Sequence, residues 1–326
     1  MEITAPQVPD SARQWMPDNT GSFSGGLADL AEKALFLIRP GLNEAAKMGA
    51  AVLAAAIVLS VIRSFLGKYR RTADIVGTAS VAAVLLNNSS TMIRLGAHTV
   101  RELSSYGKLL FPVMTSAMAA HGAVTTSAAL YAGTAVLDLI LGNLLSDLLL
   151  PGIYLYLAIS VTYAATGEPL LKRLREAIKK AVSWCLKTIL TVFTTYMSIT
   201  GVISGTTDAA ALKATKVTIS SVVPVVGGIL SEASEAVLVS AGVLKNAAGV
   251  YGILAMLAIC LEPFLKIGIQ YLVLKAVASV CLMVEGDSIA GLLEDVSSAM
   301  GLLLGITGSV CVLLLISTVC FMKGFG

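Results

Sequence analysis

The stretch MGLLLGITGSVCVLLLISTVCFM, residues 300–322, decides the fold class because it holds 23 residues without a charge. A helix needs about 20 apolar residues to cross the hydrocarbon core of a bilayer. Lipid offers no hydrogen-bond partner to a bare backbone, so segments that cross it are helices or closed barrels. The stretch predicts a transmembrane helix.

The composition of the whole chain agrees with this stretch. Of the 326 residues, 56% are hydrophobic and only 13% are charged, whereas a soluble domain carries about 25% charged residues. The mean hydropathy is +0.84. The formal net charge of +3 is small and gives no reason to expect a nucleic-acid partner. The sequence therefore predicts an all-α, polytopic membrane protein whose immediate partner is the lipid bilayer.

Further apolar runs accompany residues 300–322 along the chain. Met48–Leu66 holds one charge, at Arg63, and Ala73–Ile93 is a weaker candidate that four polar residues interrupt. Between Leu109 and Leu137 a long run contains Pro112 and two glycines, which fits a short or re-entrant segment followed by a full span that reaches about Leu145. The other candidates are Leu148–Ala165, Thr188–Ser204, Val217–Ser231, Ala247–Leu261 and Ile267–Val284. We expect seven to ten membrane segments.

Clusters of basic residues indicate which ends face the cytoplasm, because cytoplasmic loops are enriched in Lys and Arg. Residues 167–180 read GEPLLKRLREAIKK, and their leucines and alanines share one helical face while the basic residues share the other. This pattern is typical of a cationic helix that lies along an anionic membrane surface. The predicted cytoplasmic surface comprises Lys68, Arg70, Arg71, Lys172, Arg173, Arg175, Lys179 and Lys180.

A shift of 112 positions lays Pro112 onto Pro224 and Pro151 onto Pro263, with matching apolar stretches between them. We interpret this match as an internal repeat. The repeat is parallel if the segment from Leu109 crosses the membrane, and inverted if it re-enters; the positions of the basic clusters favour the parallel arrangement. The expected divisions are a polar, disordered lead (1–26), a membrane hairpin region (27–107), and two membrane repeats (108–204 and 205–326).

Motifs for soluble catalysis are missing from the sequence. It contains no GxxxxGK[ST] phosphate-binding loop and no HExxH zinc motif, and its two histidines, His98 and His121, lie far apart. The five cysteines form no CxxC pair and are expected to pack as small apolar residues. We therefore expect no enzyme activity, no cofactor and no metal.

Charged or helix-breaking residues in apolar surroundings are the candidates for a pore or a partner contact, because a charge in lipid is costly. Glu262 and Lys266 are four residues apart and pair internally if the helix continues through Pro263. The alternative is that such residues end helices at the membrane interface. The candidate helix-break, pore or partner-contact residues are Pro112, Pro151, Pro224, Gly227, Gly228, Lys245, Asn246, Glu262, Pro263 and Lys266.

The stretch GTTDAAALKATKVTISSVVPVVGGILSEASEAVLVSAGVLKNAAGVYG (205–252) resembles the signature region of the stage III sporulation protein AE family. The following LAICLEPFLKIGIQYLVLKAVASVC (257–281) is similar to the same family, and weaker similarity extends back to about residue 27. Members of that family usually begin with a hydrophobic signal-like segment and a longer soluble region, a pattern that residues 1–26 do not match.

The resemblance implies a role in endospore formation. It implies a multi-pass protein in the mother-cell membrane facing the forespore, as a subunit of the feeding-tube channel complex that joins the two cells. The implied partners are other subunits of that sporulation complex, including a separate secretion-type ATPase and ring-forming subunits. The residues themselves leave a second hypothesis open, a stand-alone secondary transporter of a small solute, which the apparent repeat and the interrupted segments favour.

Overall fold

The computed structural model describes residues 6–65, 70–120, 131, 133, 135, 142–199, 247–284 and 287–323. These residues are helical apart from short connections, and no strand occurs among them. The helices are α1 (Asp10–Arg13), α2 (Phe23–Phe65), α3 (Arg70–Ala120), the π-helical turn η2 (Leu145–Leu149), α5 (Leu150–Thr166), α6 (Pro169–Ile199), α9 (Ala247–Val284) and α10 (Asp287–Lys323). The prediction of an all-α polytopic membrane protein is confirmed.

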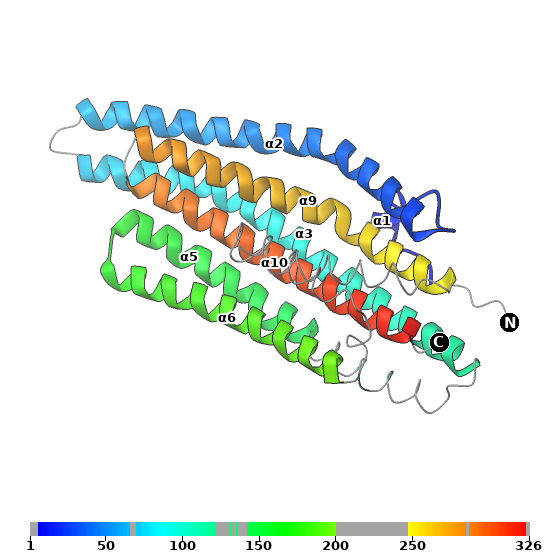
Figure 1. The fold of residues 1–326 in the computed structure, drawn as a ribbon. Coiled ribbons are helices and arrows are strands. Elements are labelled where there is room, and N and C mark those ends of the chain that lie inside the picture. Colours follow the sequence, from blue (N-terminus) through cyan, green and yellow to red (C-terminus); the bar gives the residue numbers. More distant parts are fainter. Residues whose placement is uncertain are drawn as a thin grey trace, which may run out of the picture.

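The long helices form three antiparallel hairpins, α2–α3, α5–α6 and α9–α10, whose turn ends all lie at one end of the bundle (Figure 1). In the α5–α6 hairpin, the residues of the turn itself explain why the chain reverses. Gly167 adopts φ +70° and its N–H bonds the carbonyl of Tyr163, which ends α5 in the left-handed conformation that favours glycine. Pro169 then starts α6, where a missing N–H costs nothing.

Helix α10 is the centre of the bundle. It packs against α9, α3, α5 and α6, and 94% of its most apolar stretch is buried, against 28% of that of α2. Small residues permit close contact: a Cβ atom added at Gly96 or Gly107 of α3 would stand 2.7 Å from Leu303 or Leu314 of α10. Both pairs have the same numerical offset, so α3 and α10 run in parallel.

Four described helices are long and apolar enough to cross a membrane: Phe23–Ile62, Gly142–Thr166, Gly249–Met283 and Ile289–Val319. The predicted segments Ala247–Leu261 and Ile267–Val284 are one helix, α9, with Pro263 buried in its interior. Helix α3 likewise continues through Pro112. The expected helix breaks are absent at these two prolines. At Pro263, which is buried, packing against neighbouring helices offsets the backbone hydrogen bond that a proline removes.

Two predicted spans do not meet this standard. The predicted span 73–93 lies within α3. The described part, 188–199, of the predicted span 188–204 lies within α6, and neither helix is among the four candidates. The cationic segment 169–180 is continuous with the rest of α6 and runs beside α5, whereas we expected it to lie along the membrane surface (Figure 1). The reason is that two of its side chains, Arg175 and Lys179, reach neighbouring helices.

The polar lead also differs from the expectation of disorder. Val8 and Ala12 are buried. The indole N–H of Trp15 donates to Glu262 Oε2 at 2.9 Å, and Ser11 Oγ donates to Glu102 Oε1 at 2.5 Å. Residues 6–22 therefore fold over one side of α3 and α9, because one indole and one hydroxyl hold this short segment against two partly buried carboxylates.

Candidate functional site: a polar network between two hairpins

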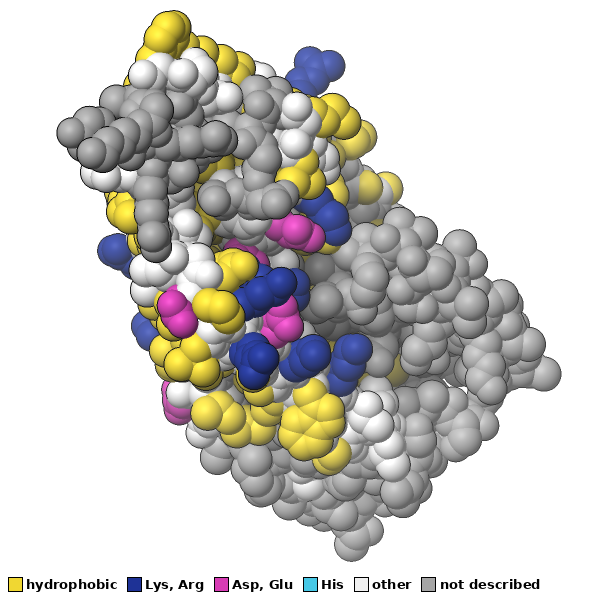
Figure 2. All heavy atoms as spheres, turned by 90° about the vertical axis from the view of Figure 1, so that its left-hand side faces the viewer, with side chains coloured by type: hydrophobic (Ala, Val, Ile, Leu, Met, Phe, Trp, Pro, Cys, Tyr) yellow, Lys and Arg dark blue, Asp and Glu magenta, His cyan; other side chains and the backbone are white. Residues whose placement is uncertain are grey.

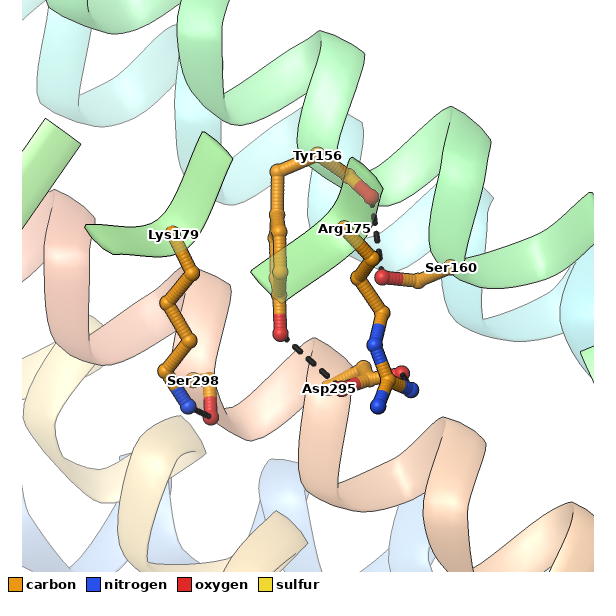
Figure 3. A network of polar contacts seen from close by, with 6 residues as sticks. All are labelled: Tyr156, Ser160, Arg175, Lys179, Asp295 and Ser298. Atoms are coloured by element: carbon orange, nitrogen blue, oxygen red, sulfur yellow. Dashed lines mark hydrogen bonds and ion pairs between the residues drawn. The ribbon is translucent and has the colours of Figure 1, made fainter. Parts of the chain in front are cut away.

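The most deeply buried charged group in the described chain is Asp295 of α10, whose side chain is 10% exposed. It is reached from two other helices (Figure 3). Tyr156 of α5, itself fully buried, donates its hydroxyl to Asp295 Oδ1 at 2.9 Å. Arg175 of α6 forms an ion pair with Oδ2. Both carboxylate oxygens thus have a partner.

The network continues on both sides of this carboxylate. The guanidinium of Arg175 lies over the ring of Tyr163 on α5, 4.7 Å from its centroid, which is the geometry of a cation–π contact. One turn further along α6, Lys179 Nζ donates to Ser298 Oγ of α10 at 2.8 Å. Ser160 bonds the carbonyl of Tyr156 at 2.8 Å and needs no other partner. Figure 3 shows Arg175 and Lys179 pointing from α6 toward α10.

This arrangement can join the α5–α6 hairpin to the α9–α10 hairpin. Removing one partner from a buried ion pair leaves an uncompensated charge, so such pairs fix which surfaces meet. The described residues contain no group of three or more His, Cys, Asp or Glu side chains that could hold a metal ion. The geometry is that of a clamp between helices.

A second polar cluster lies at the N-terminal segment. Glu262 accepts a hydrogen bond from the indole N–H of Trp15. It also forms an ion pair with Lys266, whose Nζ is 2.7 Å from Glu262 Oε1. This is the internal pair that the four-residue spacing predicted. Glu102 of α3, which holds Ser11, also lies 3.3 Å from Nδ1 of His98. The buried hydroxyl of Tyr106 of α3 has no hydrogen-bond partner among the described residues.

The structure separates the predicted site residues. Pro112 and Pro151 are exposed, while Pro263 is buried; Glu262 and Lys266 belong to the N-terminal cluster. Pro224, Gly227, Gly228, Lys245, Asn246 and Lys68 lie outside the described residues, as does the segment 200–246 of the predicted repeats, and the internal repeat stays a prediction. Arg70 and Arg71 begin α3. Within the described residues, the predicted ones do not come together around one pore.

The predicted cytoplasmic surface is divided in two. Lys172, Arg173 and Lys180 are exposed, whereas Arg175 and Lys179 point into the bundle. The bundle end that holds the three turns presents Lys and Arg side chains close to Asp and Glu side chains (Figure 2). The division follows from helical geometry. The basic residues of this segment occupy more than half of the circumference of the helix, so some of them face the bundle.

Sequence reasoning missed Tyr156, Asp295 and Ser298, none of which is among its candidate residues. A signal was present. Asp295 lies three residues after Leu292 and four before Ala299, both buried, so it shares the apolar face of the helix. An acidic residue on such a face requires a partner. No local pattern indicates which basic residue is that partner.

Comparison with known proteins gives two findings. The family model of stage III sporulation protein AE matches residues 13–324. Over 215 residues the chain is 21% identical to stage III sporulation protein AE of Bacillus subtilis (strain 168), covering 66% of this chain and 54% of that protein. The chain therefore spans about half the length of this curated relative. No solved structure matches.

Proposed function

Because the chain belongs to the stage III sporulation protein AE family, we propose that it is a multi-pass membrane subunit of the feeding-tube channel complex between mother cell and forespore. The observation that carries the proposal is the family match over residues 13–324 in a chain with four helices apolar enough to cross a membrane. A role in sporulation follows from the family. The channel role is the step that we add.

The proposed place of the protein is the mother-cell membrane that faces the forespore, and its proposed role is to line or scaffold the pore. The subunit itself is non-catalytic in this proposal. Energy comes from a separate ATPase of the same assembly, and ring-forming subunits continue the channel. The polar network supports a scaffold role, since Asp295 of α10 joins this helix to both α5 and α6.

Deletion of the gene in its own spore-forming host tests the proposal. We expect normal engulfment followed by a small, collapsing forespore, because the forespore then loses its supply from the mother cell. Restoring the gene should restore forespore size. Sporulation that proceeds normally without the gene would contradict the proposal.

The competing hypothesis of a stand-alone secondary transporter makes a different prediction. Purified protein in liposomes, with no other subunit present, should then accumulate a small solute against its gradient. A channel subunit that needs partners should not do so. The two hypotheses are thus separated by the presence or absence of transport in the isolated protein.

A further inference from the structure

Helix α6 has an exposed apolar stripe on the side turned away from the bundle. Leu170, Leu174 and Trp184 are 69%, 47% and 70% exposed, and Ala177 and Ala181 between them are exposed as well. Their spacing along the chain is four, three, four and three residues. That alternation is the a/d pattern of a helix that packs against another helix in a coiled coil.

The pattern continues for another turn. Thr188 and Thr191 keep the same spacing, and their hydroxyls bond the carbonyls of Trp184 and Lys187 in their own helix at 2.9 and 2.8 Å. With its hydroxyl satisfied by the helix backbone, a threonine offers mainly its methyl group to a neighbour. The stripe therefore extends over about six turns of α6.

A row of basic residues borders this stripe on one side. Arg173, Lys180 and Lys187 follow each other at intervals of seven residues, all three are exposed, and none makes an ion pair within the described chain. When the stripe occupies heptad positions a and d, these residues occupy position g. The residues at position e, among them Leu171 and Ile178, are partly buried toward the bundle.

We propose that this outer face of α6, here called the α6 seam (Leu170, Leu174, Ala177, Ala181 and Trp184 with the row Arg173, Lys180 and Lys187), docks a helix of a partner protein that carries acidic residues beside its apolar stripe. Apolar a and d positions supply the contact area. A uniformly basic g position selects partners by charge, because each basic residue meets the flanking residue of the other helix.

The sizes of the side chains on the seam suit a helix. Ala177 and Ala181 permit the backbones to approach closely in the middle of the contact. Trp184 offers a large aromatic surface of the kind that dominates binding energy at protein interfaces. Trp184 is 70% exposed, so its ring is accessible to a partner helix.

A bilayer fits the seam less well than a helix does. The α6 helix runs antiparallel beside α5, which belongs to a candidate span. From Arg173 to Lys187 the basic row extends along the helix by about 21 Å. Three charges spread over that depth cannot all reach one layer of lipid headgroups, whereas a partner helix can place an acid beside each of them.

A second copy of the chain also fits poorly. In an antiparallel pair of α6 helices the two basic rows would face each other and repel. In a parallel pair each basic residue would face position e of the other copy, which holds apolar residues such as Leu171 and Ile178. We therefore infer that the helix that docks on the α6 seam belongs to a different protein.

Binding to a synthetic helix tests the inference. The probe is a four-heptad peptide with Leu at a and d, Glu at e and g, and no aromatic residue. It is added to the full chain in nanodiscs of neutral phosphatidylcholine. The variant Trp15→Phe leaves Trp184 as the single tryptophan, since the chain has two. We expect saturable binding, and the fluorescence emission of Trp184 should shift to shorter wavelength because the bound peptide shields the indole from water.

Charge reversal decides whether the row at position g selects the partner. The triple substitution Arg173→Glu, Lys180→Glu and Lys187→Glu should weaken peptide binding at least about ten-fold. A peptide with Lys at e and g should bind the triple variant and not the parent. The matched control, Arg39→Glu with Lys47→Glu and Arg94→Glu, changes the net charge equally at exposed sites off the seam and should leave binding unchanged.

Two results would overturn the inference. One is a Glu peptide that fails to bind or binds parent and triple variant alike. The other is strong quenching of Trp184 by brominated lipid that the peptide does not relieve, which would assign the stripe to the bilayer. The inference rests on the proposed function for its biological partner, but this assay uses purified protein. A negative peptide result beside a positive deletion phenotype would remove the seam and leave the proposed function intact.

Discussion

Asp295 illustrates how one charge is held inside an apolar bundle. Its two oxygens accept from Tyr156 and pair with Arg175, and both charged side chains are less than 15% exposed. Desolvating the pair is costly, so it contributes little net stability compared with apolar side chains, but breaking it is expensive. Its effect is to specify which surface of α10 the α5–α6 hairpin covers.

Replacing Asp295 with Asn should lower the free energy of unfolding by about 3–5 kcal/mol, because Arg175 stays buried without its counter-ion. Chemical or thermal unfolding of the purified protein in detergent measures the change. The neighbouring Glu294→Gln removes the same charge at an exposed position and should change stability by less than about 0.5 kcal/mol. Equal effects of the two substitutions would show that the ion pair is not the cause.

The same substitution, Tyr to Phe, should change the free energy of unfolding differently at two tyrosines. Tyr156→Phe removes a hydrogen bond to a charged acceptor and should cost about 1.5–3 kcal/mol. Tyr106→Phe removes a buried hydroxyl that has no partner in the described part of the chain, and should leave stability unchanged or raise it. Unfolding curves of the two variants check this, and a large loss at Tyr106 would indicate an unrecognised partner.

At the scale of the helices, packing depends on small residues facing large ones. Gly96 and Gly107 of α3 meet Leu303 and Leu314 of α10, while Gly301 of α10 lies against Tyr271 of α9, where an added Cβ would stand 3.2 Å from the ring. Gly301 forms a GxxxG pair with Gly305, and it is Gly301 that contacts the neighbouring helix.

Gly96→Val should destabilise the α3–α10 contact by about 1–3 kcal/mol, since the new side chain overlaps Leu303 in a packed core. Gly291→Ala in α10 is the matched control, because an added Cβ there meets nothing within 4 Å. It should be neutral or stabilise the helix by up to about 1 kcal/mol. The two variants are compared by their unfolding midpoints in the same detergent.

At the scale of the whole molecule, the helices are longer than a bilayer core is thick. With 43 and 51 residues, α2 and α3 extend about 64 and 76 Å, against about 30 Å of hydrocarbon. Tilt does not absorb such a difference. The bundle therefore projects out of the membrane, which explains how charged helices such as α3 and α6 belong to the same body as the apolar ones.

The shared orientation of the three hairpins predicts their labelling. In a background without the five native cysteines, Phe65→Cys, Glu168→Cys and Met283→Cys lie beside the three turns at exposed positions. A thiol reagent that does not cross membranes should reach all three from the same side. Asp10→Cys, near the other end of the bundle (Figure 1), should react from the opposite side. Turn positions that label from different sides would contradict a bundle that crosses as one body.

The sequence alone determined the helical membrane class, the family and the position of the central helix around residues 300–322. It did so because each rests on local information: the length of an uncharged run, or a contiguous string of residues. It also located the cationic segment of α6 and the spacing that pairs Glu262 with Lys266, since both follow from helical periodicity.

Only the tertiary structure decided where helices end and what the charges face. An apolar run reports the part of a helix that suits lipid, so it left Glu294 and Asp295 outside α10 and divided α9 at Pro263. The partners of Asp295 lie 139 and 120 residues away along the chain. Contacts over such separations depend on how hairpins pack together, and no local pattern encodes that packing.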